Sequence, residues 1–136
     1  MTVSGFVAFC DDIRFENSGK AIIIGLYTED LVPSHLPQVI PLSFWVRLTG
    51  VPAGETKLTM KIGANDKIQH TADLTLAVHH PERPTNLYFV GPHISLDQPG
   101  KIFLELSGFP DGSRFKETLI VHSPPEGAAA TKDAGK

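Results

Sequence analysis

Apolar and polar residues alternate through most of this chain, in short runs that end at clusters of Gly, Pro, Asn, Asp and Ser. A period of two residues is typical of a β-strand, because successive side chains point to opposite faces of the sheet. The alternation is clearest at Leu58, Met60 and Ile62 and again at Ile102, Leu104 and Leu106. Repeated at a spacing of roughly 8–12 residues, with no convincing helical segment, this pattern predicts an antiparallel β-sandwich.

Length and composition predict one folded domain. A chain of 136 residues with 41% apolar and 20% charged residues is long enough to bury a core without disulfides or a metal. Residues 1–122 carry the alternating runs, and we expect them to form the β-sandwich domain. Residues 123–136 are small, charged and interrupted by proline, so we expect a flexible, disordered C-terminal tail.

The charge balance and the single cysteine restrict the partners and the compartment. A formal net charge of −3 and an isoelectric point near 6.0 lack the basic footprint of a nucleic-acid-binding domain. No apolar run approaches the roughly 18 residues of a membrane span, and the N-terminal residues do not resemble a signal peptide. Because Cys10 has no intrachain partner, we expect a protein of the cytoplasm, or one made there and assembled into a phage particle.

Two hairpins and one crossing loop are expected along the chain. Ala21–Tyr27 should pair with the strand that precedes the turn at Asn17–Lys20. Its run of isoleucines is apolar on both faces, which predicts a strand covered on both sides and makes its outer face a candidate interface. Glu29–Pro41 contains three prolines and is expected to be a loop between the sheets. Pro110–Ser113 should close the last hairpin.

Aromatic residues provide the strongest functional indication. In Leu42–Leu48 the even-numbered residues share one face, so a core on that side leaves Trp45 and Arg47 on the outer face. Tyr27, Tyr88 and Phe103 also occupy positions where alternation allows outward side chains. Exposed aromatics beside arginine are typical of protein interfaces. The candidate binding residues are Trp45, Arg47, Tyr27, Tyr88 and Ile23; the alternative is that the second sheet or a loop covers these aromatics.

Four histidines form the alternative candidate site, a metal centre made of His70, His79, His80 and His93. Adjacent strand residues point to opposite faces, so His79 and His80 can both bind a metal only if the loop turns there. Their spacing does not match a helical ligand motif, and His70 lies on an apolar face. A metal-dependent binding protein or enzyme is therefore the alternative hypothesis.

The remaining reactive residues favour ordinary structural roles. Neighbouring carboxylates at Asp11 and Asp12 raise the pKa of a thiol, so Cys10 is expected to be a core cysteine rather than a nucleophile. The same two aspartates could bind calcium with Glu29 and Asp30, but solvated loop carboxylates are the favoured interpretation. The chain has no nucleophile elbow, phosphate loop or dinucleotide fingerprint, so we expect neither an enzyme nor a cofactor.

A family resemblance adds a fold type. The segments Cys10–Glu16, Gly19–Lys20 and Ile24–Tyr27 resemble an uncharacterised family of small bacterial and phage-encoded proteins, a domain of unknown function. Gln98–Leu106 resembles the entry of a strand in such modules, with Ile102 where tyrosine is common. The resemblance implies a single immunoglobulin-like, Greek-key β-sandwich of about eight strands, and it implies no active site.

Together these observations predict a non-enzymatic protein-interaction or assembly module. Its expected partner is another protein or a second copy of itself, with no nucleic acid and no membrane, and a phage-derived structural component is one form that it could take. Besides the metal hypothesis, a carbohydrate-binding module that uses Trp45 and Tyr88 is a further alternative.

Overall fold

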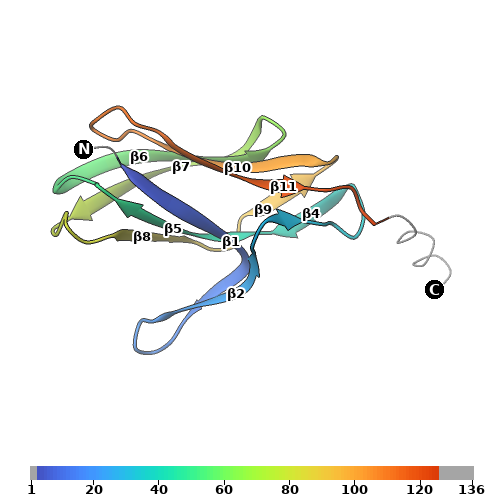
Figure 1. Cartoon of the computed structure of the whole chain (residues 1–136), viewed down its shortest axis with the longest axis horizontal. Helices are drawn as coiled ribbons and strands as arrows, with labels where there is room; N and C mark the ends of the chain where they lie inside the picture. Colours follow the sequence, from blue (N-terminus) through green and yellow to red (C-terminus); the bar gives the residue numbers. More distant parts are fainter. Residues whose placement is uncertain (1–2, 126–136) are drawn as a thin grey trace.

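A computed structural model describes residues 3–125 of the chain, and every regular element in this range is a β-strand (Figure 1). The strands are β1 (Ser4–Phe15), β2 (Ala21–Tyr27), β3 (Asp30–Leu31), β4 (Gln38–Pro41), β5 (Ser43–Thr49), β6 (Gly54–Ala64), β7 (Lys67–Val78), β8 (Thr85–Phe89), β9 (His93–Leu96), β10 (Gly100–Ser107) and β11 (Phe115–Val121). The flexible tail predicted for residues 123–136 lies mostly outside the described residues; Ser123–Pro125 follow β11 without regular structure.

The strands form a β-sandwich of two main sheets (Figure 1). One sheet has the order β2-β1-β5-β8, which we call the first sheet, and the other has the order β3-β11-β10-β6-β7. A separate ribbon pairs β4 with β9. All pairings are antiparallel except the short parallel contact of β3 with β11. The predicted antiparallel sandwich is confirmed, with more strands than the eight expected.

The core lies where the inner faces of the two sheets meet. Phe44, Val46 and Leu48 of β5 are fully buried, as the alternation of that segment predicts. From the opposite sheet, Ile102 and Leu104 of β10 are equally buried. Fully burying one such side chain contributes roughly 1.5–3 kcal/mol. Alternating residues of both sheets therefore supply one continuous core.

The loop predicted for Glu29–Pro41 is wrong in part, because β3 and β4 lie within this segment. Pro33 and Pro37 fall between the two strands, where proline removes no ladder hydrogen bond. Pro41 is the last residue of β4 and lies opposite His93 in the two-stranded ribbon. Short edge ribbons tolerate proline, so the prolines limited the strand lengths without excluding strands.

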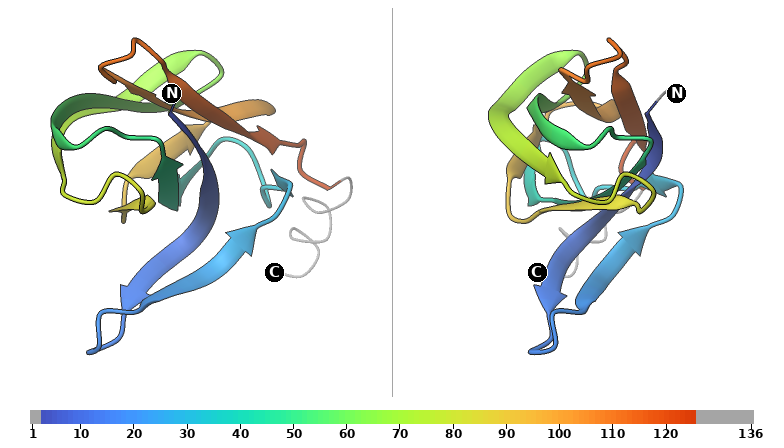
Figure 2. Two further views of the ribbon diagram at one scale, coloured as in Figure 1. Left: turned by 60° about the vertical axis from the view of Figure 1, so that its left-hand side comes forward. Right: turned by 90° about the vertical axis from the view of Figure 1, so that its left-hand side faces the viewer.

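The β1–β2 hairpin extends beyond the body of the sandwich as a twisted ribbon (Figure 2). The strand that precedes the turn, β1, is continuous; its first part pairs with β5 and its last part pairs only with β2. Within one chain, β2 is not covered on both sides. Three of its apolar side chains, those of Ile22, Ile24 and Leu26, are 41%, 39% and 52% exposed.

Candidate interaction surface

An array of aromatic rings crosses the outer face of the first sheet. Trp45 of β5 lies directly opposite Tyr88 of β8, and their rings are nearly parallel, with centroids 6.4 Å apart and an interplanar angle of 9°. Phe6 of β1 meets the other side of Trp45 edge to face, at 5.1 Å and 78°. Strand alternation places these three side chains on the face that points away from the core.

The projecting hairpin extends this array by one more ring. Phe15, the last residue of β1, meets Tyr88 edge to face at 5.1 Å and 86°. We call Phe6, Trp45, Tyr88 and Phe15 the outer aromatic row. Phe6, Tyr88 and Phe15 are 43%, 38% and 51% exposed, whereas Trp45 is half-buried between its neighbours. The row therefore presents a contiguous apolar surface to solvent.

Local bonds hold Trp45 in place within the row. Its indole Nε1 donates a hydrogen bond to Oδ1 of Asn86 at 2.8 Å. Asn86 pairs with the exposed Arg47 across β5 and β8, so a cation flanks the rings. Aromatic pairs in these geometries contribute about 0.5–1.5 kcal/mol each beyond their buried area. These contacts therefore fix the positions of the rings on the surface.

The structure brings together Trp45, Arg47 and Tyr88 from the predicted set, and separates the rest. Tyr27 packs against the core, and its hydroxyl donates to Oδ1 of Asp11 at 2.7 Å. Ile23 is half-buried opposite Ile13, which is itself buried in the ribbon. These two residues are not part of the outer aromatic row.

Phe103, also considered as an outward aromatic, is only 9% exposed. The ammonium group of Lys116 lies over its ring, 5.3 Å from the centroid. The long aliphatic stem of a lysine covers apolar surface while its charge remains in water. The interpretation of Phe103 as a contact residue is therefore wrong.

Sequence reasoning missed Phe6 and Phe15. A signal existed for Phe6, because alternation places it on the opposite face from the buried Phe9, together with Ala8 and across from Arg47. No comparable signal existed for Phe15. Its contact with Tyr88 depends on how the two-stranded ribbon twists, and such ribbons twist more strongly than wider sheets.

The four histidines do not converge. Nε2 of His70 lies 2.6 Å from the backbone carbonyl oxygen of His93, at the start of β9. His79 and His80 follow the far end of β7, about 30 Å away at the rise of a β-strand. Nδ1 of His80 lies 3.4 Å from Glu82. Across residues 3–125, no group of three His, Cys, Asp or Glu side chains is arranged to hold a metal ion.

Three of the four acidic residues considered for calcium, Asp11, Asp12 and Asp30, are bonded elsewhere. Asp11 accepts the hydrogen bond from Tyr27, and Asp12 binds the guanidinium of Arg14 at 3.0 Å. Oδ2 of Asp30 lies 2.6 Å from Nε2 of His122. Their local partners explain these carboxylates without a cation.

Cys10 is buried at the point where β1 passes from the sandwich into the ribbon. Its thiol faces the carbonyl oxygen of Ser43 at 3.5 Å. Burial, followed by the negative charge of Asp11, raises the pKa of the Cys10 thiol from 9.0 to about 11. A thiolate is therefore strongly disfavoured near neutral pH, which argues against a nucleophilic role.

Alkaline pH is expected to destabilise the fold through Cys10. Below pH 9 the thiol is protonated in both the folded and the unfolded state; between pH 9 and about 11 only the unfolded state loses the proton. Folded protein therefore loses stability as pH rises through this window, by about 2 kcal/mol.

Urea titrations at pH 8, 9, 10 and 11 measure this loss. The variant Cys10→Ala should show a flatter decline between pH 9 and 10 than the natural protein. Above pH 10 both proteins decline further, because burial and the hydrogen bond to Asp11 raise the pKa of Tyr27 to about 12. Equal slopes between pH 9 and 10 would contradict the assignment to Cys10.

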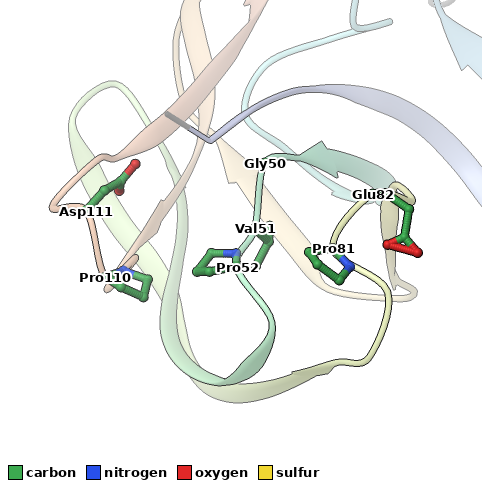
Figure 3. A pocket seen from close by; sticks show the side chains of 7 residues that line it. All are labelled: Gly50, Val51, Pro52, Pro81, Glu82, Pro110 and Asp111. Carbon is green, nitrogen blue, oxygen red and sulfur yellow. The ribbon is translucent and has the colours of Figure 1, made fainter. Parts of the chain in front are cut away.

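A separate cavity of about 620 Å³ lies at one end of the sandwich (Figure 3). Three loops line it: those after β5, between β7 and β8, and between β10 and β11. The lining residues are Gly50, Val51, Pro52, Pro81, Glu82, Pro110 and Asp111. Glu82 and Asp111 lie on opposite sides, with the prolines between them (Figure 3).

The chemistry of this cavity is apolar contact flanked by two carboxylates. Asp111 accepts hydrogen bonds from the hydroxyl and the backbone N–H of Ser113, and these bonds hold its pKa below the usual range. Among the described residues that line the cavity, Glu82 and Asp111 are the ionisable ones.

The fold is a small β-sandwich, and the outer aromatic row is its most distinctive external feature. A model of the family of unknown function DUF6941 matches residues 5–116, and the chain belongs to this family. The match includes all four residues of the outer aromatic row. No curated protein matches the chain. Residues 3–125 contain no helix with the length and hydrophobicity needed to cross a membrane.

Proposed function

We propose that this protein is a non-enzymatic interaction and assembly module that associates with protein surfaces, including its own, through the outer aromatic row. The single observation that carries this proposal is the contiguity of four rings on one face, three of them more than a third exposed. Scattered exposed hydrophobic residues are ordinary, whereas contiguous apolar patches mark interaction sites.

The composition of the surface supports a protein partner. Tyr, Trp, Phe and Arg are enriched at the centres of protein interfaces, where they contribute most of the binding energy. Trp45 and Tyr88 already contact neighbouring rings, so little side-chain freedom remains to be lost on binding. Preorganisation of this kind increases affinity because it lowers the entropy cost of association.

Family resemblance supports a finer proposal, that the sandwich is immunoglobulin-like and serves as a small structural component of the kind that phages encode. Non-sequential neighbours such as β1 with β5 and β6 with β10 support a Greek-key type of connection.

The experiment that tests the proposed function is the solution mass of the untagged full chain, measured by light scattering over a wide concentration range. We expect a mass that rises to a defined oligomer. A mass that stays at 14.8 kDa up to millimolar concentration would contradict self-association.

Carbohydrate binding is a second candidate, favoured by the nearly parallel planes of Trp45 and Tyr88. Flat aromatic surfaces can stack against the apolar face of a sugar ring. Titration of a glycan panel against the fluorescence of the single tryptophan distinguishes the two functions. Saturable, glycan-dependent quenching would favour a carbohydrate ligand, and an unchanged spectrum would remove this candidate.

A further inference from the structure

β2 has one free edge, since it ends the order β2-β1-β5-β8. Within residues 3–125 it is the longest edge strand that contains neither a charged residue nor proline. Natural proteins usually protect such edges with charges, proline, bulges or a covering segment, because unpaired backbone groups recruit another strand. The strand Ala21–Tyr27 contains no charged residue and no proline.

The other long edge strand, β7, is protected against pairing with another strand, whereas β2 is not. It contains Lys67 and Asp73, and side chains near its start bond to the backbone of β9. Gln69 both donates to the carbonyl oxygen of Ser95, at 2.9 Å, and accepts from its N–H, at 2.8 Å. The contrast shows that this fold covers one exposed edge and leaves the other available.

The backbone groups on the free edge of β2 can be identified from the pairing with β1. The N–H of Glu16 donates to the carbonyl oxygen of Lys20 at 2.8 Å. Because bonded and non-bonded pairs alternate in an antiparallel ladder, Ile22 and Ile24 also direct their backbone groups toward β1. Ala21 and Ile23 therefore direct theirs toward solvent.

The exposed side chains of β2 suit a strand of the same sequence. Ile22 and Ile24 lie on one face, and each is about 40% exposed. Lys20 precedes the strand and the exposed Glu29 follows it. An antiparallel second copy keeps the two Lys20 side chains at opposite ends of the shared ladder, and likewise the two Glu29 side chains, whereas a parallel copy places like charges together. The separation of like charges thus favours the antiparallel arrangement.

We propose that β2 pairs antiparallel with β2 of a second copy, so that the first sheets of two molecules form one eight-stranded sheet across a twofold axis. This inference rests on the proposed self-association and adds to it a second contact, the free edge of β2, separate from the outer aromatic row. The shared ladder supplies backbone hydrogen bonds, and the isoleucines of both copies cover one another.

The register follows from the geometry of the edge. Residues whose backbone groups point outward must lie opposite one another in the two copies. The twofold axis therefore passes midway between the two copies of one residue, and not between two neighbouring residues of the strand. Gly25 has a φ of +69°, which ends the regular extended part of the strand. Centring the pairing on Ile23 keeps it within Ala21–Gly25 and sets Ile22 of each copy opposite Ile24 of the other.

This register predicts a charge-swap rescue in the full chain. Ile22→Glu and Ile24→Lys, each opposite a residue of the other sign in β1, should each weaken dimerisation at least about tenfold, because each introduces a charge into an apolar contact. In the double variant each new lysine lies opposite a new glutamate of the second copy, so dimerisation should recover relative to either single variant. Both positions are exposed, which preserves the fold.

Sedimentation equilibrium measures the dimerisation constants, with Ile68→Lys as the control. Ile68 is 54% exposed on β7 of the other sheet, so this variant should associate like the natural protein. Natural protein that is monomeric throughout would overturn the self-association and the inference together. A natural oligomer that both single variants leave unchanged would overturn only the β2 pairing, and a double variant no better than the single ones would overturn the register.

Discussion

Replacement of Phe44 by alanine is expected to lower the free energy of unfolding by about 3–5 kcal/mol, the largest effect of any single substitution considered. Phe44 is fully buried in the core. The centroid of its ring lies 6.0 Å from that of Phe9 and 5.3 Å from that of Phe89. Alanine removes these contacts and leaves a cavity that strands fixed on both sides can fill only in part.

Urea denaturation followed by circular dichroism measures the change. Small domains are stable by only about 5–15 kcal/mol, so Phe44→Ala could prevent folding altogether. Phe44→Leu is a milder variant that should fold and lose less of the free energy of unfolding. Phe6→Ala is the matched control, because Phe6 is a 43% exposed phenylalanine of the same sheet. Equal losses for Phe44→Ala and Phe6→Ala would contradict the assignment of inner and outer faces.

Replacement of Tyr88 by alanine should weaken self-association by about 2 kcal/mol, or roughly thirtyfold, while leaving the fold intact. Tyr88 lies between Trp45 and Phe15, so its loss divides the outer aromatic row into two parts. Its side chain is 38% exposed, and its removal leaves no core cavity.

The association constant is measured by light scattering on proteins whose unfolding midpoints have first been compared. Tyr88→Phe should associate nearly as well as the natural protein, because the ring contacts remain. Ile68→Ala removes an exposed hydrophobic residue from the other sheet and should have no effect. If Tyr88→Ala associated as strongly as Ile68→Ala, the row would not be the contact surface.

The inner half of the sandwich could be predicted from the sequence. Strict alternation in β5 and β10 identifies Phe44, Val46 and Leu104 as core residues, and the structure confirms them. The closing hairpin of β10 and β11 was also predictable, because its turn contains Pro, Asp and Gly. Both are local signals, which depend on period and turn chemistry alone.

The projecting ribbon could not be predicted in the same way. An apolar run such as Ala21–Ile24 suits a strand covered on both faces, and only the tertiary arrangement shows that β2 has one neighbour. β4 was missed for a related reason, since a strand of four residues paired only with β9 leaves almost no periodic pattern.

The candidate surface was predictable only in part. Alternation placed Trp45 and Arg47 on the outer face, but the pairing of β5 with β8 was needed to bring Tyr88 beside them. Tyr27 occupies a comparable position in the alternation and nevertheless packs against the core. Contacts between distant strands, rather than the pattern within one strand, decide which aromatics form a surface.

The measurement that tests the central claim most directly is the fluorescence of Trp45, the only tryptophan, over the concentration range in which the solution mass is followed. If the outer aromatic row is the association surface, emission should shift to shorter wavelength and acrylamide quenching should fall as the mass rises. A rising mass with an unchanged spectrum and unchanged quenching would show that the molecules associate elsewhere and would contradict the claim.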